Sequence, residues 1–196
     1  MDAGPFTKLP ADGSKPWETN FGTKRPLTFS LHAAKALPWR TFGTVEFGVG
    51  VGWFRASGRA RFLDLTVSPD KTTFSMVPLT LSLTYRLDML FDRWSIPIVP
   101  YGRAALVRDN WWVGGTTGST VKSGATNGYS YGGGVGLVLD FIDPTLAREL
   151  DRDTGINHTL LVFDISKTKV DDFGSKSSWD LSDTQPTYSF GLLFVF

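Results

Sequence analysis

The side chains of this chain that could do electrostatic chemistry are charged residues inside stretches where apolar and polar residues alternate. They occupy the polar positions of that alternation, so they are expected on the same face as the other polar side chains. They are Glu46, Arg86, Asp88, Arg103, Asp140 and Asp164. Isolated buried charges are costly, whereas carboxylates and guanidinium groups in a narrow polar interior can pair. We therefore expect an internal charge network, built from an Arg86/Asp88 set and an Arg103/Glu46 set, that holds a wall rigid. The functional alternative is a selectivity filter.

Nucleophilic catalysis needs a hydroxyl or thiol, a histidine and an acid held together. The chain has no cysteine and two histidines, His32 and His158. Neither histidine has an obvious serine and acid partner in sequence, so we interpret His32 as facing an interior and His158 as anchoring a turn. We expect no catalytic residues and no enzyme. A lipid-modifying outer-membrane enzyme, with a Ser/His/acid cluster near the membrane rim, is the alternative.

Two acidic segments contain residue types that could bind a cation. The segment Asp151–Gly155 lacks the spaced carboxylates and closing glutamate of an EF-hand, so a turn after a helix is the better interpretation. Asp171, Asp172, Asp180 and Asp183 could gather to bind a divalent cation, although a solvated loop is preferred. We expect no metal site and no cofactor. A net charge of +1 also argues against an electrostatic nucleic-acid binder.

The elements that must position these charges are β-strands, because the apolar residues recur with a period of two. The clearest alternation is in Thr72–Leu90. The seven predicted strands are Pro26–Leu37, Thr41–Ala56, Thr72–Leu90, Ile96–Trp112, Tyr129–Ile142, Asn157–Val170 and Gln185–Phe196. Up-and-down closure needs an even number, so Met1–Phe6 is interpreted as the end of a truncated eighth strand. Pro144–Asp151 predicts a short helix, with Asp143 as its N-cap and proline at its first position.

Long and short connections alternate along the predicted strands, as they do in outer-membrane barrels with long extracellular loops and short periplasmic turns. The long ones are Thr7–Arg25, Ser57–Lys71, Val113–Thr126 and Asp171–Thr184. The shorter ones are Pro38–Arg40, Phe91–Ser95 and Asp143–Gly155. Aromatic residues are expected in two girdles at the membrane interfaces, where amphipathic rings are favoured. These residues are Trp39 and Trp94 on the periplasmic side, Trp53, Trp111 and Trp112 on the extracellular side, and Phe196 at the periplasmic rim.

Several strings in this sequence carry a family resemblance. They are Val99–Leu106 followed by Trp111 and Trp112, then Leu139–Pro144, Gly155–Thr159 and Val170–Gly174. In this order, between Thr41 and Phe196, they resemble a family of small outer-membrane β-barrel proteins of myxobacteria and related bacteria. The resemblance implies an outer-membrane barrel of about eight strands. It implies no particular activity, because that family is defined by its barrel.

Together these observations predict a single domain over residues 1–196. The predicted fold is an all-β, antiparallel, up-and-down transmembrane β-barrel of about eight strands with one short periplasmic helix. About eight strands leave an interior just wide enough for side chains to fill, so we expect no wide pore. The expected role is structural or surface interaction. A small transporter or ligand-binding barrel is the alternative.

The expected location is the outer membrane of a Gram-negative bacterium, with the signal peptide absent from this chain. The expected partners are outer-membrane lipid and lipopolysaccharide, and the barrel-assembly machinery, which would recognise the C-terminal strand ending in Phe196. We expect a monomer that binds no nucleic acid.

Overall fold

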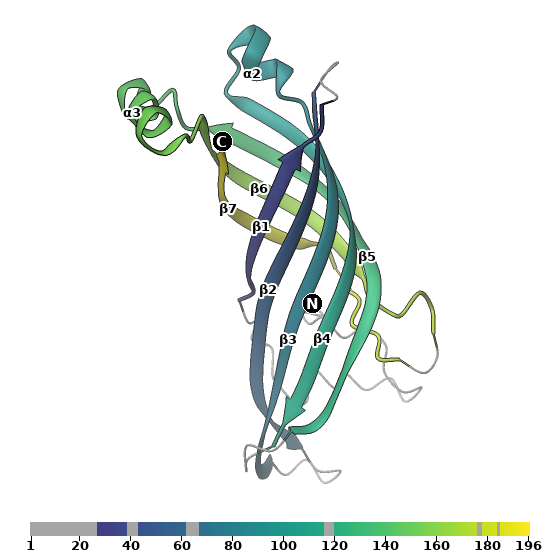
Figure 1. The fold of residues 1–196 in the computed structure, drawn as a ribbon. Coiled ribbons are helices and arrows are strands. Elements are labelled where there is room, and N and C mark those ends of the chain that lie inside the picture. Colours follow the sequence, from purple (N-terminus) through teal and green to yellow (C-terminus); the bar gives the residue numbers. More distant parts are fainter. Residues whose placement is uncertain (1–26, 39–42, 62–66, 116–119, 176–177, 184) are drawn as a thin grey trace.

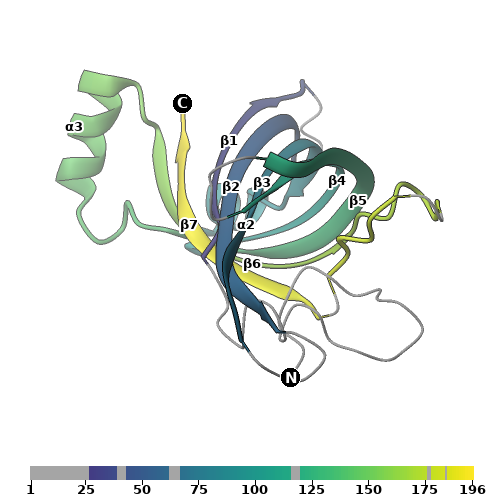
Figure 2. The ribbon, with the colours of Figure 1, turned by 90° about the horizontal axis from the view of Figure 1, so that it is seen from below.

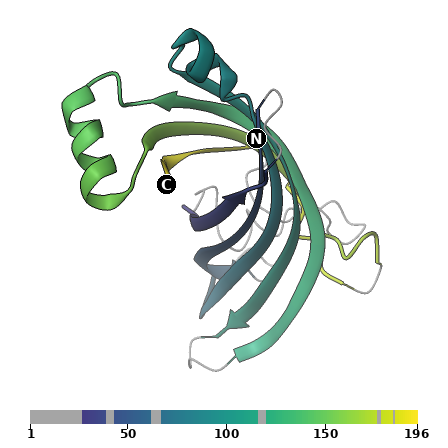
Figure 3. The same ribbon diagram turned by 45° about the horizontal axis from the view of Figure 1, so that its top comes forward.

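The protein folds as one antiparallel sheet that curls into a half-barrel (Figures 1 and 3). The structure is a computed structural model, and it describes residues 27–38, 43–61, 67–115, 120–175, 178–183 and 185–196. The expected strand Met1–Phe6, the connection Thr7–Arg25 and the girdle residue Trp39 lie outside the described residues. The all-β class and the up-and-down order are confirmed.

Over the ranges that the structure describes, seven strands make up the sheet, and each is hydrogen-bonded to its neighbour in sequence. They are β1 (Phe29–Ala36), β2 (Thr44–Arg61), β3 (Val67–Arg86), β4 (Ile98–Gly114), β5 (Thr120–Val138), β6 (His158–Lys169) and β7 (Thr187–Val195). All seven predicted strands are therefore present. Among the described residues β1 and β7 are the two edges of the sheet and do not pair with each other.

The strands of the β4–β5 hairpin are longer than the hydrophobic pattern predicts. The Gly, Thr and Ser-rich segment Val113–Thr126 was expected to be a loop, but β5 already begins at Thr120. Val113 pairs with Lys122, and Trp112 with Ser123. The prediction was wrong because alternation of apolar residues marks only a strand with one buried face, whereas this ladder continues with polar residues on both faces.

Within the described residues two helices, instead of the single predicted one, connect strands at the same end of the half-barrel (Figure 1). Helix α3 (Pro144–Thr154) begins where expected, because the Asp143 carboxylate accepts hydrogen bonds from the backbone N–H groups of Thr145 and Leu146, at 3.1 and 3.0 Å. It stands away from the sheet beyond β7 (Figure 2). Helix α2 (Met89–Trp94) replaces the predicted turn Phe91–Ser95. Its six residues are too few to show a helical period in the sequence.

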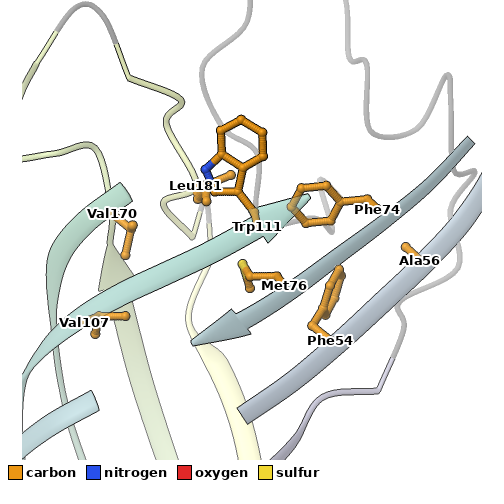
Figure 4. Packing of buried hydrophobic residues seen from close by; sticks show 8 residues of the cluster. All are labelled: Phe54, Ala56, Phe74, Met76, Val107, Trp111, Val170 and Leu181. Carbon is orange, nitrogen blue, oxygen red and sulfur yellow. The ribbon is translucent and has the colours of Figure 1, made fainter. Parts of the chain in front are cut away.

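Buried apolar residues lie on the concave face of the sheet, in two groups. The larger group lies at the end opposite the helices (Figure 4), and its members are Phe54, Ala56, Phe74, Met76, Val107, Trp111, Val170 and Leu181. The smaller group, Val99, Val138 and Leu160, packs against Phe91 of α2 at the helical end. Between them the concave face is polar. That polar zone holds most of the charged residues singled out in the sequence.

Candidate functional site

The charged interior of the half-barrel is the candidate site, and its first cluster joins the ends of β2 and β3. The Arg86 guanidinium contacts the carboxylates of Glu46, with Nη2 to Oε1 at 3.0 Å, and Asp88, with Nε to Oδ1 at 3.3 Å. The Arg86 side chain is only 8% exposed. Asp88 stands at the N-cap of α2 but makes no side-chain cap hydrogen bond, because its carboxylate is directed at Arg86. One cation thus ties two strands to the first helix.

The expected pairing of Arg103 with Glu46 is wrong, because Arg103 pairs with Asp164 instead. The Nη2 to Oδ1 distance is 3.1 Å, and the pair reaches from β4 to β6 across β5. Gly132 and Gly134 of β5 lie directly between the two residues in the register. A Cβ at Gly134 would collide with the Phe163 carbonyl oxygen and lie 2.8 Å from the Tyr101 hydroxyl. Glycine therefore leaves the room through which the two charged side chains meet.

His32 faces this same polar zone from β1. It pairs with Gly50 in the register, and a Cβ at Gly50 would collide with the His32 ring and the Thr80 hydroxyl. His32 therefore lies on the concave face, as the sequence predicts.

His158 and Asp140 form a hydrogen-bonded pair at the helical end. His158 Nδ1 lies 2.6 Å from Asp140 Oδ2, and Asp140 Oδ1 accepts a hydrogen bond from the Thr159 backbone N–H at 3.1 Å. The Phe91 ring packs edge-on against the imidazole, with centroids 5.3 Å apart. Among the described residues no serine or threonine hydroxyl contacts this imidazole. The arrangement fixes the β5–β6 connection against α2.

At the opposite end, the connection between β6 and β7 folds into the mouth of the half-barrel. Trp179 stacks on Trp111, with ring centroids 4.1 Å apart and planes 6° apart, and Lys122 lies over the Trp179 ring at 5.2 Å. Leu181 is buried against the same group, and its backbone N–H donates to the Val170 carbonyl at 2.8 Å. Figure 4 shows Leu181 beside the Trp111 indole. We call residues 178–183 the mouth segment.

The girdle residues do not all lie where the sequence predicts. Trp111 is 5% exposed and faces the interior, so its assignment to a girdle is wrong. Its neighbour Trp112 faces the other way and packs edge-on against Trp53, with centroids 5.7 Å apart. Trp94 is exposed at the end of α2, and Phe196 is exposed beyond β7. Adjacent residues in a strand point to opposite faces, so the sequence itself indicated that Trp111 and Trp112 could not both lie on the outer face.

The acidic residues of the β6–β7 connection do not gather into a cation site. Asp172 accepts from the Asn127 amide, Asp180 from the Ser182 backbone N–H, and Asp171 pairs with Lys169. Asp183 accepts from the Thr168 backbone N–H at 3.1 Å, and burial raises the pKa of its carboxyl. Across the described residues, no three or more His, Asp or Glu side chains are grouped to hold a metal ion.

No protein-family model, curated protein sequence or solved structure matches this chain. In the part of the chain that the structure describes, neither helix has the length and apolar character needed to cross a bilayer.

Proposed function

We propose that this protein is an outer-membrane β-barrel that spans the bilayer and has a filled interior. Its role is structural or a surface interaction, and membrane lipid and lipopolysaccharide surround it. The barrel-assembly machinery is the partner that inserts it. The resemblance of its sequence strings to a family of small bacterial outer-membrane barrels agrees with this proposal.

The observation that carries the proposal is the apolar convex face of the sheet. All seven strands expose large apolar side chains there, and these are Phe29, Leu31, Phe47, Val49, Val51, Leu79, Leu81, Leu83, Ile98, Leu106, Val135, Leu137, Leu161, Phe163, Ile165, Phe190, Leu192 and Phe194. Phe190 is 86% exposed and Leu31 is 76% exposed. Monomeric soluble proteins rarely expose a contiguous apolar patch above a few hundred Å². Exposing such a surface costs free energy in water, but not in the hydrocarbon core of a bilayer.

The concave face supports the proposal by its contrast with the convex face. A soluble ligand-binding barrel keeps apolar side chains inside and polar ones outside, whereas here the ion pairs Arg86–Glu46 and Arg103–Asp164 are inside. A polar interior with a lipid-facing apolar exterior is the pattern of transmembrane barrels.

The edges β1 and β7 are the second structural argument. In hydrocarbon every unpaired backbone N–H and C=O group costs several kcal/mol, so a sheet spans a membrane only when it is closed. We propose that closure of these two edges completes a barrel of about eight strands. A narrow barrel of that size has its interior filled by the charged side chains and by the mouth segment.

Detergent dependence tests the proposal. Cells that express the chain with a secretion signal are fractionated, and the purified protein is run on gels with and without heating. The folded barrel is expected in the outer-membrane fraction, extracted only by detergent, and faster in gel mobility before heating than after it. A protein that stays in solution without detergent would contradict the proposal.

A further inference from the structure

The two faces of the sheet differ in the sign of the charges they carry. Within the described strand residues, the concave face carries both signs, with the acids Glu46, Asp109 and Asp164 beside the arginines Arg86 and Arg103. The charged residues on the convex face are all basic, and they are Lys35, Arg55, Arg59, Lys71, Arg108, Lys167 and Lys169. Except for Lys35, they lie toward the end opposite the helices. A collar of positive charge therefore follows the apolar belt on the convex face.

Arg108 lies in a shallow groove on this convex face. The groove has a volume of about 370 Å³, and its side chains include Leu79, Leu81, Leu106, Arg108, Asn127 and Phe173. The register places Leu79 opposite Arg108 and Leu81 opposite Leu106, so the aliphatic floor continues directly into the guanidinium. The groove is apolar at one end and cationic at the other.

The ring of Phe173 is held at the groove by an unusual backbone. Asp172 and Phe173 both have left-handed φ angles, of 54° and 57°. Residues other than glycine adopt such angles only where the surroundings hold them. The Asp172 backbone N–H donates to the Asn127 carbonyl at 2.8 Å, and the Asn127 side-chain amide donates to the Asp172 carboxylate at 2.9 Å. Phe173 itself is 66% exposed, so the strain presents an apolar ring instead of burying it.

Arg108 is hydrogen-bonded to a neutral side chain and forms no ion pair with the described residues. Its Nη1 donates to the Asn127 side-chain oxygen at 3.1 Å, and Asn127 is a neutral partner. Among the described residues no carboxylate lies within ion-pair distance of Arg108. The asparagine orients the guanidinium and leaves its other N–H groups available. A guanidinium binds phosphate through two parallel hydrogen bonds.

We propose that this groove binds a membrane lipid with an anionic phosphate headgroup. The phosphate pairs with Arg108, and an acyl chain lies on Leu79, Leu81 and Leu106 with Phe173 at its edge. The inference rests on the proposed function, because only a sheet in a bilayer presents this groove to lipid. Charge complementarity selects the occupant: a purely apolar partner would leave Arg108 unpaired, and the cationic collar favours an anionic one.

Lipid titration of the detergent-solubilised full chain, followed by native mass spectrometry, tests the proposal. The probes are dioleoyl-phosphatidylglycerol, dioleoyl-phosphatidylcholine and inorganic phosphate. We expect one phosphatidylglycerol to be retained in preference to phosphatidylcholine. Arg108→Gln should weaken that binding about tenfold, the loss expected for a charged hydrogen-bonding partner. Phe173→Ser should also weaken it, and Arg108→Lys should restore part of it.

Arg55→Gln is the matched control, because Arg55 is an exposed arginine of the convex face that does not line the groove. It should bind phosphatidylglycerol as the unmodified chain does. Equal binding of the two lipids, or full binding by Arg108→Gln, would overturn the proposal in favour of a protein occupant. Displacement of the lipid by inorganic phosphate alone would overturn it in favour of a free-anion site.

The gel-mobility measurement separates this proposal from the proposed function. If the parent protein and its variants remain heat-modifiable but show no lipid preference, the lipid site is overturned and the proposed barrel is not. A parent protein that needs no detergent overturns the proposed function and the lipid site together.

Discussion

Arg86 is the residue on which the polar interior depends most at the helical end. Its guanidinium is shared by Glu46 and Asp88 and is nearly sequestered from water. Both carboxylates are also shielded, with side chains 14% and 20% exposed. Removing the cation would leave two like charges close together in a poorly hydrated space, which is the costly way to break a buried ion pair.

Arg86→Gln should therefore destabilise the folded protein by about 3–5 kcal/mol. The measurement is urea unfolding in detergent, followed by tryptophan fluorescence and heat-modifiable mobility. Arg152→Gln is the control, because its pair with Asp153 joins two mostly exposed side chains, and its effect should stay within about 1 kcal/mol. Equal stabilities of the two variants would show that the Arg86 cluster contributes nothing beyond a surface pair.

At this scale the sequence predicted which residues face the interior but not their partners. Parity alone placed Glu46, Arg86, Arg103 and Asp164 on one face. The pairs depend on the stagger between strands and on the glycines of β5, which let Arg103 reach β6 across an intervening strand. The same alternation could have placed Arg108 on the convex face, because it follows Leu106 by two residues.

At the scale of elements, β5 is the strand whose sequence determines how closely its neighbours approach. Its concave parity includes Gly132, Gly134 and Gly136. At Gly134 the backbone of β6 and the Tyr101 side chain occupy the space that a Cβ would need. A close approach of this kind makes even one added methyl group costly.

Gly134→Ala should cost about 1–3 kcal/mol of unfolding free energy, because β6 or Tyr101 must move to admit the methyl group. Gly102→Ala is the matched control, since a Cβ at Gly102 meets nothing within 4 Å. That variant should be as stable as the parent in the same urea titration. If both alanine variants unfold at the parent's urea midpoint, the close approach of β5 and β6 is not a constraint.

The strands were predictable and their lengths were not, for one physical reason. Period-two alternation is strong where one face is apolar along the whole strand, as in Thr72–Leu90, and it is weak where small and polar residues occupy both faces, as in residues 120–126 of β5. The β4–β5 hairpin therefore extends into Val113–Thr126 without a hydrophobic signal. Helix α2 was not predicted because a segment of this length is too short to be a stable helix by itself. Tertiary contacts hold it in the folded protein, where Phe91 packs against His158 and against the smaller apolar group.

At the scale of the whole molecule, the curl of the sheet brings the interior charges and the mouth segment together. The stacked pair Trp111–Trp179 and the buried Leu181 occupy one end, and the pair Arg103–Asp164 crosses the middle. In the barrel of about eight strands that we propose, an interior filled in this way would leave no continuous wide path for solute.

Planar-bilayer recordings should therefore show no conductance above the baseline of the lipid film. The reason is that side chains of both signs fill the interior and the mouth segment covers one end. Trp179→Ala removes the stacked ring and should leave the strands intact, so any channel that it opens reports on the mouth segment. Stable, wide conductance by the parent protein would contradict the filled interior and favour a transporter.

By itself the sequence determined the strand period, the polar and apolar parities and the capped helix α3, because these depend on neighbours within a few residues. Which carboxylate meets which arginine, and that the Trp111 ring stacks on Trp179, followed only from the tertiary structure. The groove beside Arg108 and Phe173 also appears only there, since it joins β3, β4, β5 and the segment after β6. Such contacts depend on curl and stagger across strands, and these are properties of the assembled sheet that no local pattern encodes.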